Sequence, residues 1–254
     1  MARPTFQSML NERQPVGVVW LALGCVAVVE IAAHFKPAAI VIDMQHGLWD
    51  RHSLEAAIGV ARVSTQVIVR CADNTASAIS TALDAGAHSV LIPLIESADA
   101  ARRAVSFSRY PPEGIRSAGG VRPLLRGVER FASANSEVTV GVMIETIEGV
   151  REAEAISAVE GIDYLFIGTG DLAMSRGATN EDDIKGDCAH VRDVATRHDL
   201  PCGIFTHGVS GALKELAHGY DMAVIANDMD IVKTGVAGAQ ALFEQTLGAR
   251  FISQ

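Results

Sequence analysis

The stretch AAIVIDMQHGLWD, residues 38–50, shows the pattern that decides the fold. A short apolar run is followed at once by Asp43 and His46. A run this short and this continuously apolar is typical of a strand covered on both faces in a parallel sheet. Its polar residues then stand at the carboxyl end of the strand, where barrels of alternating strands and helices carry their catalytic groups.

The same pattern recurs along the chain with helix-like segments between the apolar runs. Apolar residues spaced by three and four predict helices at 53–64, 75–87 and 210–219, and Gly86, Gly161 and Gly219 each precede a strand, as expected for helix ends. The predicted strands are 16–23, 38–43, 66–70, 89–94, 138–145, 163–168, 202–206 and 222–227.

Eight such units in 254 residues predict an α/β protein with a single (β/α)8 TIM barrel that spans 1–254 as one domain. A Gly-x-Gly-x-x-Gly motif does not follow the first strand, which disfavours an open dinucleotide-binding sheet.

Composition limits the class of protein. The formal net charge of −9 argues against nucleic acid or an anionic membrane as partner, because both require a basic surface. The four cysteines are widely spaced, as expected of free thiols in a reducing compartment. The first residues have no apolar targeting segment, and no apolar run is long enough to cross a membrane. We therefore expect a cytoplasmic protein.

Two segments suggest functional or subunit contacts in addition to the barrel. Residues 106–135 are longer than an ordinary loop and helix, and such long connections are often functional or lie at an interface. The last helix has an apolar stripe that fits packing on its own barrel or on a neighbouring subunit. The stripe consists of Val236, Ala239, Leu242, Phe243, Leu247 and Phe251.

Polar and aromatic residues at the predicted strand ends form the candidate site. Each residue also has a purely structural explanation. Asp171 could be a helix N-cap, Glu145 could be an acidic residue in the first turn of a helix, and His46 could be a solvated histidine. The combination is the stronger signal, because a barrel brings its strand ends to one mouth. The set consists of Trp20, Asp43, His46, Arg70, Glu145, Gly168, Thr169, Gly170, Asp171, Phe205 and His207.

Glu145 and Asp171 are the candidate metal ligands. Two carboxylates without a nearby cysteine predict a hard, oxygen-rich site for Mg²⁺ or Mn²⁺. The open coordination positions suit the carboxylate and keto oxygens of a 2-oxo acid. Backbone N–H groups of the turn at 168–171 offer a place for the carboxylate, although a phosphate site there stays open.

A group of motifs resembles the HpcH/HpaI aldolase family of metal-dependent pyruvate aldolases, related to 4-hydroxy-2-oxoheptanedioate aldolase. The motifs occur in order along nearly the whole chain. They are VIDMQHG, VIVRCADN, LDAGAHSVLIP, RYPPEGIRS, MIET and FIGTGDLA.

The resemblance implies roles for individual residues. Glu145 and Asp171 match ligands of Mg²⁺, Mn²⁺ or Co²⁺, with no organic cofactor, and Arg70 matches the residue that faces the keto oxygen of pyruvate. His46 matches the general acid/base, to which Asp43 and, from a neighbouring subunit, Asp84 contribute. The family further implies a homohexamer, a trimer of dimers, with the C-terminal helix exchanged between subunits.

This sequence departs from the family pattern close to the metal. Gln45 replaces the usual acidic residue before the histidine, and Met143 replaces a glutamine two places before Glu145. The usual Gly-Pro-Ala-Asp is Gly-Thr-Gly-Asp at 168–171. These changes bear on substrate preference more than on reaction class.

The predicted function is reversible cleavage of 4-hydroxy-2-oxo acids to an aldehyde and pyruvate, or a related 2-oxo acid such as hydroxypyruvate. Trp20 and Phe205 are candidate walls of the aldehyde pocket, with an ordinary core position as the alternative. The rival functions are an acyl-CoA lyase of the citramalyl or malyl type and a non-catalytic 2-oxo acid binding protein. A Schiff-base aldolase is disfavoured because none of the four lysines follows a predicted strand.

Overall fold

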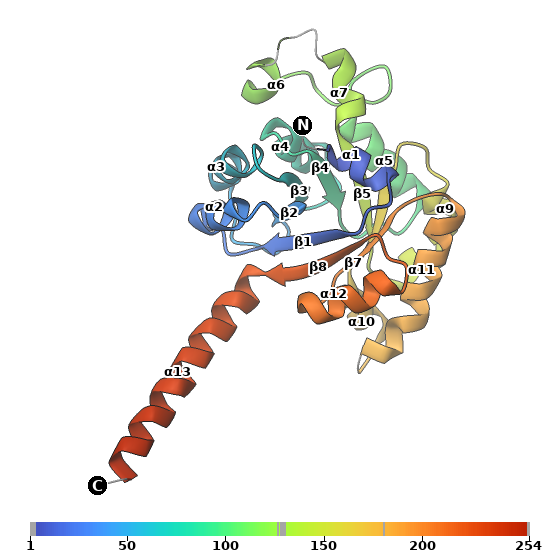
Figure 1. Cartoon of the computed structure of the whole chain (residues 1–254). Helices are drawn as coiled ribbons and strands as arrows, with labels where there is room; N and C mark the ends of the chain where they lie inside the picture. The colour runs from blue at the N-terminus through green and yellow to red at the C-terminus, as the bar shows by residue number, and fades with distance from the viewer. Residues whose placement is uncertain (1–3, 126, 128–130, 180, 253–254) are drawn as a thin grey trace.

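Eight parallel strands close into a barrel in the computed structural model, which describes residues 4–125, 127, 131–179 and 181–252 (Figure 1). Each strand pairs with the next one, and β8 pairs with β1. The predicted barrel is confirmed, and every strand end lies within two residues of its predicted position. The strands are β1 (Val16–Leu21), β2 (Ala39–Asp43), β3 (Gln66–Arg70), β4 (Ser89–Ile92), β5 (Thr139–Ile144), β6 (Tyr164–Ile167), β7 (Cys202–Ile204) and β8 (Met222–Asn227).

Helices surround the barrel, and local sequence signals fix where several of them begin. The side chains of Asp50, Thr75 and Ser97 accept backbone N–H groups at the starts of α3, α4 and α5. The described helices are α1 (Phe6–Asn11), α2 (Val26–His34), α3 (Arg51–Ala61), α4 (Ala76–Asp84), α5 (Ala98–Ser108), α6 (Val121–Leu125), α7 (Phe131–Glu137), α8 (Ile147–Arg151), α9 (Ala153–Ser157), α10 (Thr169–Arg176), η2 (Glu181–Ile184), α11 (Lys185–Arg197), α12 (Gly208–Ala217) and α13 (Asp228–Ile252).

Helix ends follow the glycine pattern of the sequence. Gly86 and Gly219 directly follow the C-cap residues of α4 and α12, and both have a left-handed backbone with φ of 96° and 93°. Glycine adopts this conformation without a steric penalty, so these positions end each helix and turn the chain into the next strand.

Side chains fill the interior of the barrel. Tyr164 and Phe166 of β6 point inward, whereas Leu165 between them joins the layer under the helices. The Tyr164 ring requires Gly141 on β5, because a Cβ atom there would lie 2.1 Å from the ring. Phe6 of α1 meets the same ring edge-on at 5.7 Å. The interior is therefore solid, and α1 closes its amino-terminal end.

The long segment at 106–135 contains α6 and α7, which stand out from the barrel above α4 (Figure 1). A cavity of about 480 Å³ separates this segment from Gln66, His88 and Val138, at the amino ends of β3, β4 and β5. The segment thus lies at the end of the barrel opposite the candidate site. Its assignment to an interface stays a prediction.

The last helix, α13, extends away from the barrel (Figure 1). Every residue from Ile231 to Leu247 is exposed, including Val236 at 66% and Phe243 at 61%. The predicted apolar stripe therefore does not pack on its own barrel; the side chain of Phe251 lies outside the described part. Within the described chain no helix, α13 included, is long and apolar enough to cross a membrane.

Candidate active site at the carboxyl ends of the strands

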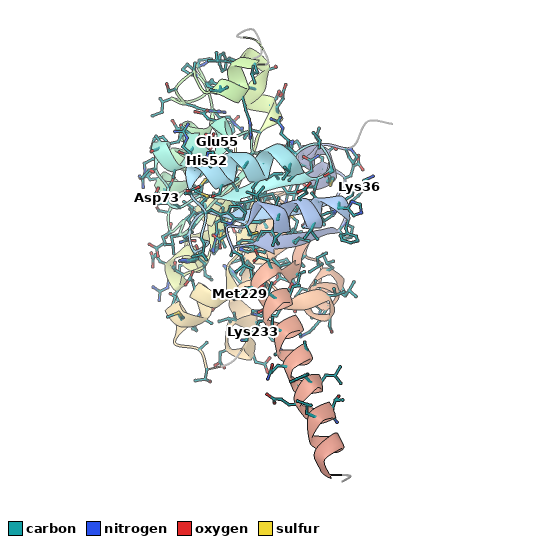
Figure 2. The ribbon with its side chains drawn as sticks, turned by 90° about the vertical axis from the view of Figure 1, so that its left-hand side faces the viewer. Lys36, His52, Glu55, Asp73, Met229 and Lys233 are labelled. Atoms are coloured by element: carbon teal, nitrogen blue, oxygen red, sulfur yellow. The ribbon has the colours of Figure 1, made fainter. Side chains whose placement is uncertain are left out.

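The strands bring most of the candidate residues to one end of the barrel. Figure 2 views the molecule from the side of α2 and α3, with His52 at the start of α3 and Met229 at the start of α13. Asp43 and Arg70 are paired residues of β2 and β3. Glu145 directly follows β5, and Asp171 lies in the first turn of α10, just after β6.

A buried ion pair joins Asp43 to Arg70. Arg70 donates from Nε to Asp43 Oδ1 at 2.8 Å and from Nη2 to Oδ2. Both residues are at most 7% exposed. Burial raises the pKa of Asp43, but the hydrogen bonds and charge of Arg70 outweigh this, so the pKa lies below its usual value. Asp43 therefore stays ionised and holds the guanidinium in one orientation.

Aromatic side chains continue outward from this ion pair. The Arg70 guanidinium lies 5.0 Å from the ring centroid of Trp20, whose indole N–H donates to Asp43 Oδ2 at 3.2 Å. Phe205, after β7, meets Trp20 edge-on at 5.3 Å and is only half-buried. His207 lies a further 5.5 Å from Phe205 and is exposed. These contacts place Trp20 deep in the mouth and Phe205 at its edge.

Glu145 and Asp171 form a close pair of carboxylates. Glu145 is 1% exposed, and burial raises its pKa to about 7. The N–H of Leu94 and the charge of Arg70 oppose this shift, whereas the charge of Asp171 and its hydrogen-bond contact add to it. Two acidic side chains held this close suit a shared cation.

Gly168 and Leu94 shape the surroundings of Glu145. A Cβ atom at Gly168 would lie 2.4 Å from Glu145 Oε2, so only glycine fits there. Leu94 has a positive φ of 54°, and its N–H donates to Glu145 Oε1 at 2.8 Å. Sequence reasoning missed Leu94, since a leucine next to a strand gives no sign of a left-handed backbone.

The turn after β6 presents backbone N–H groups beside the carboxylates. Gly168 is the N-cap of α10, and the side chain of Thr169 donates to Phe205 O at 3.2 Å. The amides of Thr169 and Gly170 belong to the first turn, where helix N–H groups lack partners within the helix. Such a turn attracts anions.

His46 lies on an exposed loop that Asp43 anchors. The His46 N–H donates to Asp43 Oδ1 at 3.2 Å, and the Gln45 N–H donates to the same oxygen at 3.0 Å. Asp43 thus contacts the backbone of this loop, Arg70 and Trp20. Its predicted contribution to the His46 side chain stays a prediction.

Asp84 is not brought to this site within one chain. It ends α4 and accepts from Arg116 Nη2 at 2.8 Å, close to the cavity at the amino end of the barrel. Its predicted contribution therefore requires a second subunit.

Two departures from the family pattern lie in this region. Met143 is buried, and its Cε lies 3.0 Å from the position of a Cβ on Gly168. It therefore gives the site an apolar floor beside Glu145. The side-chain oxygen of Gln45 is buried without a hydrogen-bond partner among the described residues.

The donor set fits a hard divalent cation. Beyond the two carboxylates, the described residues contain no cluster of three or more His, Cys, Asp and Glu side chains. Two oxygen-bearing ligands leave most coordination positions for substrate and water, as in Mg²⁺ sites that bind through one or two carboxylates.

Comparison with known proteins gives consistent matches. The profile of the HpcH/HpaI aldolase/citrate lyase family matches residues 17–229. A hydroxypyruvate/pyruvate aldolase of Paraburkholderia phytofirmans is 33% identical over 236 residues, which cover 88% of this chain and 91% of that protein. A 5-keto-4-deoxy-D-glucarate aldolase of Salmonella arizonae is 31% identical, covering 85% and 87%. The crystal structure of an HpcH/HpaI aldolase/citrate lyase family protein from Burkholderia cenocepacia superposes with a TM-score of 0.87 at 31% identity, covering 94% and 98%.

Proposed function

Since the chain belongs to the HpcH/HpaI aldolase/citrate lyase family and is an aldolase, we propose that it cleaves 4-hydroxy-2-oxo acids reversibly. The products are an aldehyde and pyruvate, or a related 2-oxo acid such as hydroxypyruvate. The observation that carries this proposal is the carboxylate pair Glu145–Asp171 beside the fixed guanidinium of Arg70.

Glu145 and Asp171 are the residues that would hold Mg²⁺, Mn²⁺ or Co²⁺. The raised pKa of Glu145 supports this assignment, because a buried carboxylate next to another one is stabilised by a neighbouring positive charge. Bound there, a divalent cation supplies Lewis acidity toward the carboxylate and keto oxygen of the 2-oxo acid.

Arg70 stabilises the negative charge that develops on the keto oxygen. Asp43 engages Nε and Nη2, so Nη1 is the nitrogen left for the substrate. A guanidinium that is already oriented needs no rearrangement when the pyruvate enolate forms.

His46 moves the proton. In cleavage, His46 accepts the proton of the 4-hydroxyl, directly or through a water; the C3–C4 bond then breaks, and the aldehyde leaves. The bonding electrons form the enolate of pyruvate, which takes up a proton at C3. In the synthetic direction, the same groups remove a C3 proton and return one to the new hydroxyl.

The rest of the mouth binds and orients the substrate. The amides of Thr169 and Gly170 receive the carboxylate of the 2-oxo acid. Trp20 and Phe205 line the path of the aldehyde, because Phe205 stands at the edge of the mouth and contacts Trp20.

Lysine chemistry does not fit this chain. All four lysines are exposed, namely Lys36, Lys185, Lys214 and Lys233. Figure 2 shows Lys36 on the outer edge of the barrel and Lys233 on α13. A Schiff-base aldolase needs a desolvated lysine in its pocket, so this route is disfavoured.

We also propose assembly through α13. Its exposed apolar stripe matches exposed apolar residues on the helices that flank the barrel at β8 and β1, namely Ile31 of α2, Phe35 at the C-cap of α2, and Val209 and Leu213 of α12. Exchange of α13 between two chains buries both surfaces. A hexamer built as a trimer of such dimers also brings Asp84 of one subunit to the site of another.

Deuterium exchange tests the proposal. The enzyme should exchange the methyl protons of pyruvate in D₂O with Mn²⁺, and EDTA should stop the exchange. His46→Ala and Glu145→Gln should each lower the rate at least 100-fold. Unchanged exchange in both variants would exclude the mechanism, and metal-dependent binding without exchange would favour a binding protein. Cleavage without coenzyme A separates the proposal from an acyl-CoA lyase.

A further inference from the structure

Asp228, the first residue of α13, is a buried carboxylate that accepts backbone N–H groups of a different loop as well as the N–H of its neighbour Met229. It is 2% exposed. Its Oδ1 accepts the N–H of Ala22 at 2.9 Å, and its Oδ2 accepts the N–H of Leu23 at 2.9 Å. The cap of α13 is made instead by Asn227, whose Oδ1 accepts the N–H of Asp230 at 2.7 Å and whose amide donates to the Asp230 carboxylate. Asp228 therefore serves the loop after β1.

That loop is interlocked with the loop that carries His46. Ala22 O accepts the N–H of Leu48 at 2.7 Å, and the indole of Trp49 donates to Leu21 O at 3.0 Å. Gly24 has a left-handed φ of 69°, and a Cβ atom there would lie 2.3 Å from Leu48 O. The contact is close enough that a shift of one loop moves the other.

The His46 loop is consequently held from two sides. On the strand side, Asp43 binds the backbone of His46, and Asp43 O accepts the N–H of Gly47 at 3.1 Å. On the other side, Leu48 binds Ala22, which Asp228 holds. The His46 residue is exposed, so the position of its imidazole depends on this backbone more than on packing.

We propose that Asp228 is a positioning residue that sets the place of His46 through Ala22 and Leu48. The inference rests on the proposed function, in which His46 moves the proton. It also links the position of α13 to proton transfer by His46, because Asp228 belongs to α13 and at the same time holds the loop after β1. A displacement of about 1 Å at a catalytic group is enough to slow a reaction strongly.

The test compares Asp228→Asn with Asp230→Asn in the full chain with Mn²⁺. Both variants remove one negative charge from the first turn of α13, so their effect on the helix dipole is matched. Only Asp228→Asn places an amide donor against the N–H groups of the loop. We expect it to lower kcat for pyruvate deuterium exchange about tenfold with KM within twofold, since it leaves Arg70, Glu145 and Asp171 in place. Asp230→Asn should stay within twofold in both.

Amide hydrogen exchange gives a second readout. The Leu48 amide should exchange at least tenfold faster in Asp228→Asn than in the wild type or in Asp230→Asn. Equal kcat in the two variants, or an unchanged Leu48 amide, would overturn the inference.

Gly24→Ala covers the case in which Asp228→Asn does not fold. It keeps Asp228 but forces Leu48 O away, so it should reproduce the loss in kcat with little change in KM; wild-type kcat would contradict the coupling. The experiments distinguish failure of the proposed function from failure of the positioning role of Asp228. A wild-type enzyme that exchanges no deuterium refutes the proposed function, whereas an active wild type matched by Asp228→Asn refutes only the positioning role.

Discussion

Asp43 and Arg70 occupy directly paired positions on β2 and β3, and their side chains form a buried ion pair with 2.8 Å between Oδ1 and Nε. Because the register of β2 and β3 places the two residues side by side, Asp43 holds the Arg70 guanidinium in one orientation. The same carboxylate also receives the Trp20 indole and the backbone N–H of His46. One buried acid thus connects Arg70, the Trp20 ring and the loop that carries His46.

Loss of this acid should cost stability in a way that depends on pH. The pKa of Asp43 lies below its ordinary value of 3.8 in the folded chain. Its stabilisation is therefore fully present above about pH 4 and is lost as the pH falls through the folded pKa. Asp43→Asn should be about 3 kcal/mol less stable at pH 7, because Arg70 is left buried and unpaired. Urea unfolding at pH 7 and pH 3 measures this difference, and a difference that does not shrink at pH 3 would contradict the ion pair.

Arg70→Lys should show that geometry, and not charge alone, matters at this position. Lysine keeps the charge but loses the fork that binds Asp43 and, in the proposed function, the substrate at the same time. We expect kcat for pyruvate exchange to fall about 100-fold. The control is Arg51→Lys, which changes an exposed arginine paired with Glu55 and should leave the rate unchanged.

Glu145 should make the EDTA-treated protein less stable at high pH. Its pKa is raised to about 7, so the folded state holds a proton that the unfolded state releases near pH 4.5. Stability should therefore fall as the pH rises from about 4.5 to 7. In EDTA, Glu145→Gln should match the wild type at pH 5 and exceed it by about 2 kcal/mol at pH 8. Glu148→Gln, at an exposed position, is the control, and an equal gain there would refute the assignment.

Phe205→Ala should change the choice of aldehyde. The half-buried ring stands at the edge of the mouth, so its removal makes room for a larger group. We expect the ratio of kcat/KM for a bulky aldehyde over acetaldehyde to rise about tenfold, with pyruvate exchange nearly unchanged. Phe107→Ala removes a half-buried ring on α5, far from the mouth, and should leave the ratio as it is.

Phe243→Asp should weaken assembly through α13. The ring is 61% exposed on the apolar stripe, and a charge there is costly to bury against a second chain. Light scattering should show a smaller species than the wild type at the same concentration. Gln240→Asp, on an exposed polar position of the same helix, should assemble normally.

The sequence predicts the barrel because each strand is a continuous apolar run; β3 and β8 have the predicted bounds, 66–70 and 222–227. Convergence of Asp43, Arg70 and Glu145 then follows from parallel strands alone. Contacts between residues that are far apart in the sequence cannot be predicted from the strand pattern. The Leu94 amide and the Asp228 carboxylate bind partners far away in the chain, and an aspartate at the start of a helix looks like an ordinary first-turn acid.

The packed interior and the buried side chains of Phe6, Met9 and Leu10 close the amino end of the barrel, so the candidate site is reached from the carboxyl ends of the strands. In the proposed reaction, substrate enters and both products leave past Phe205, with the 2-oxo acid bound deeper than the aldehyde. Under the proposed function we therefore expect the aldehyde to leave before pyruvate, and pyruvate to compete with the aldol substrate for the free enzyme.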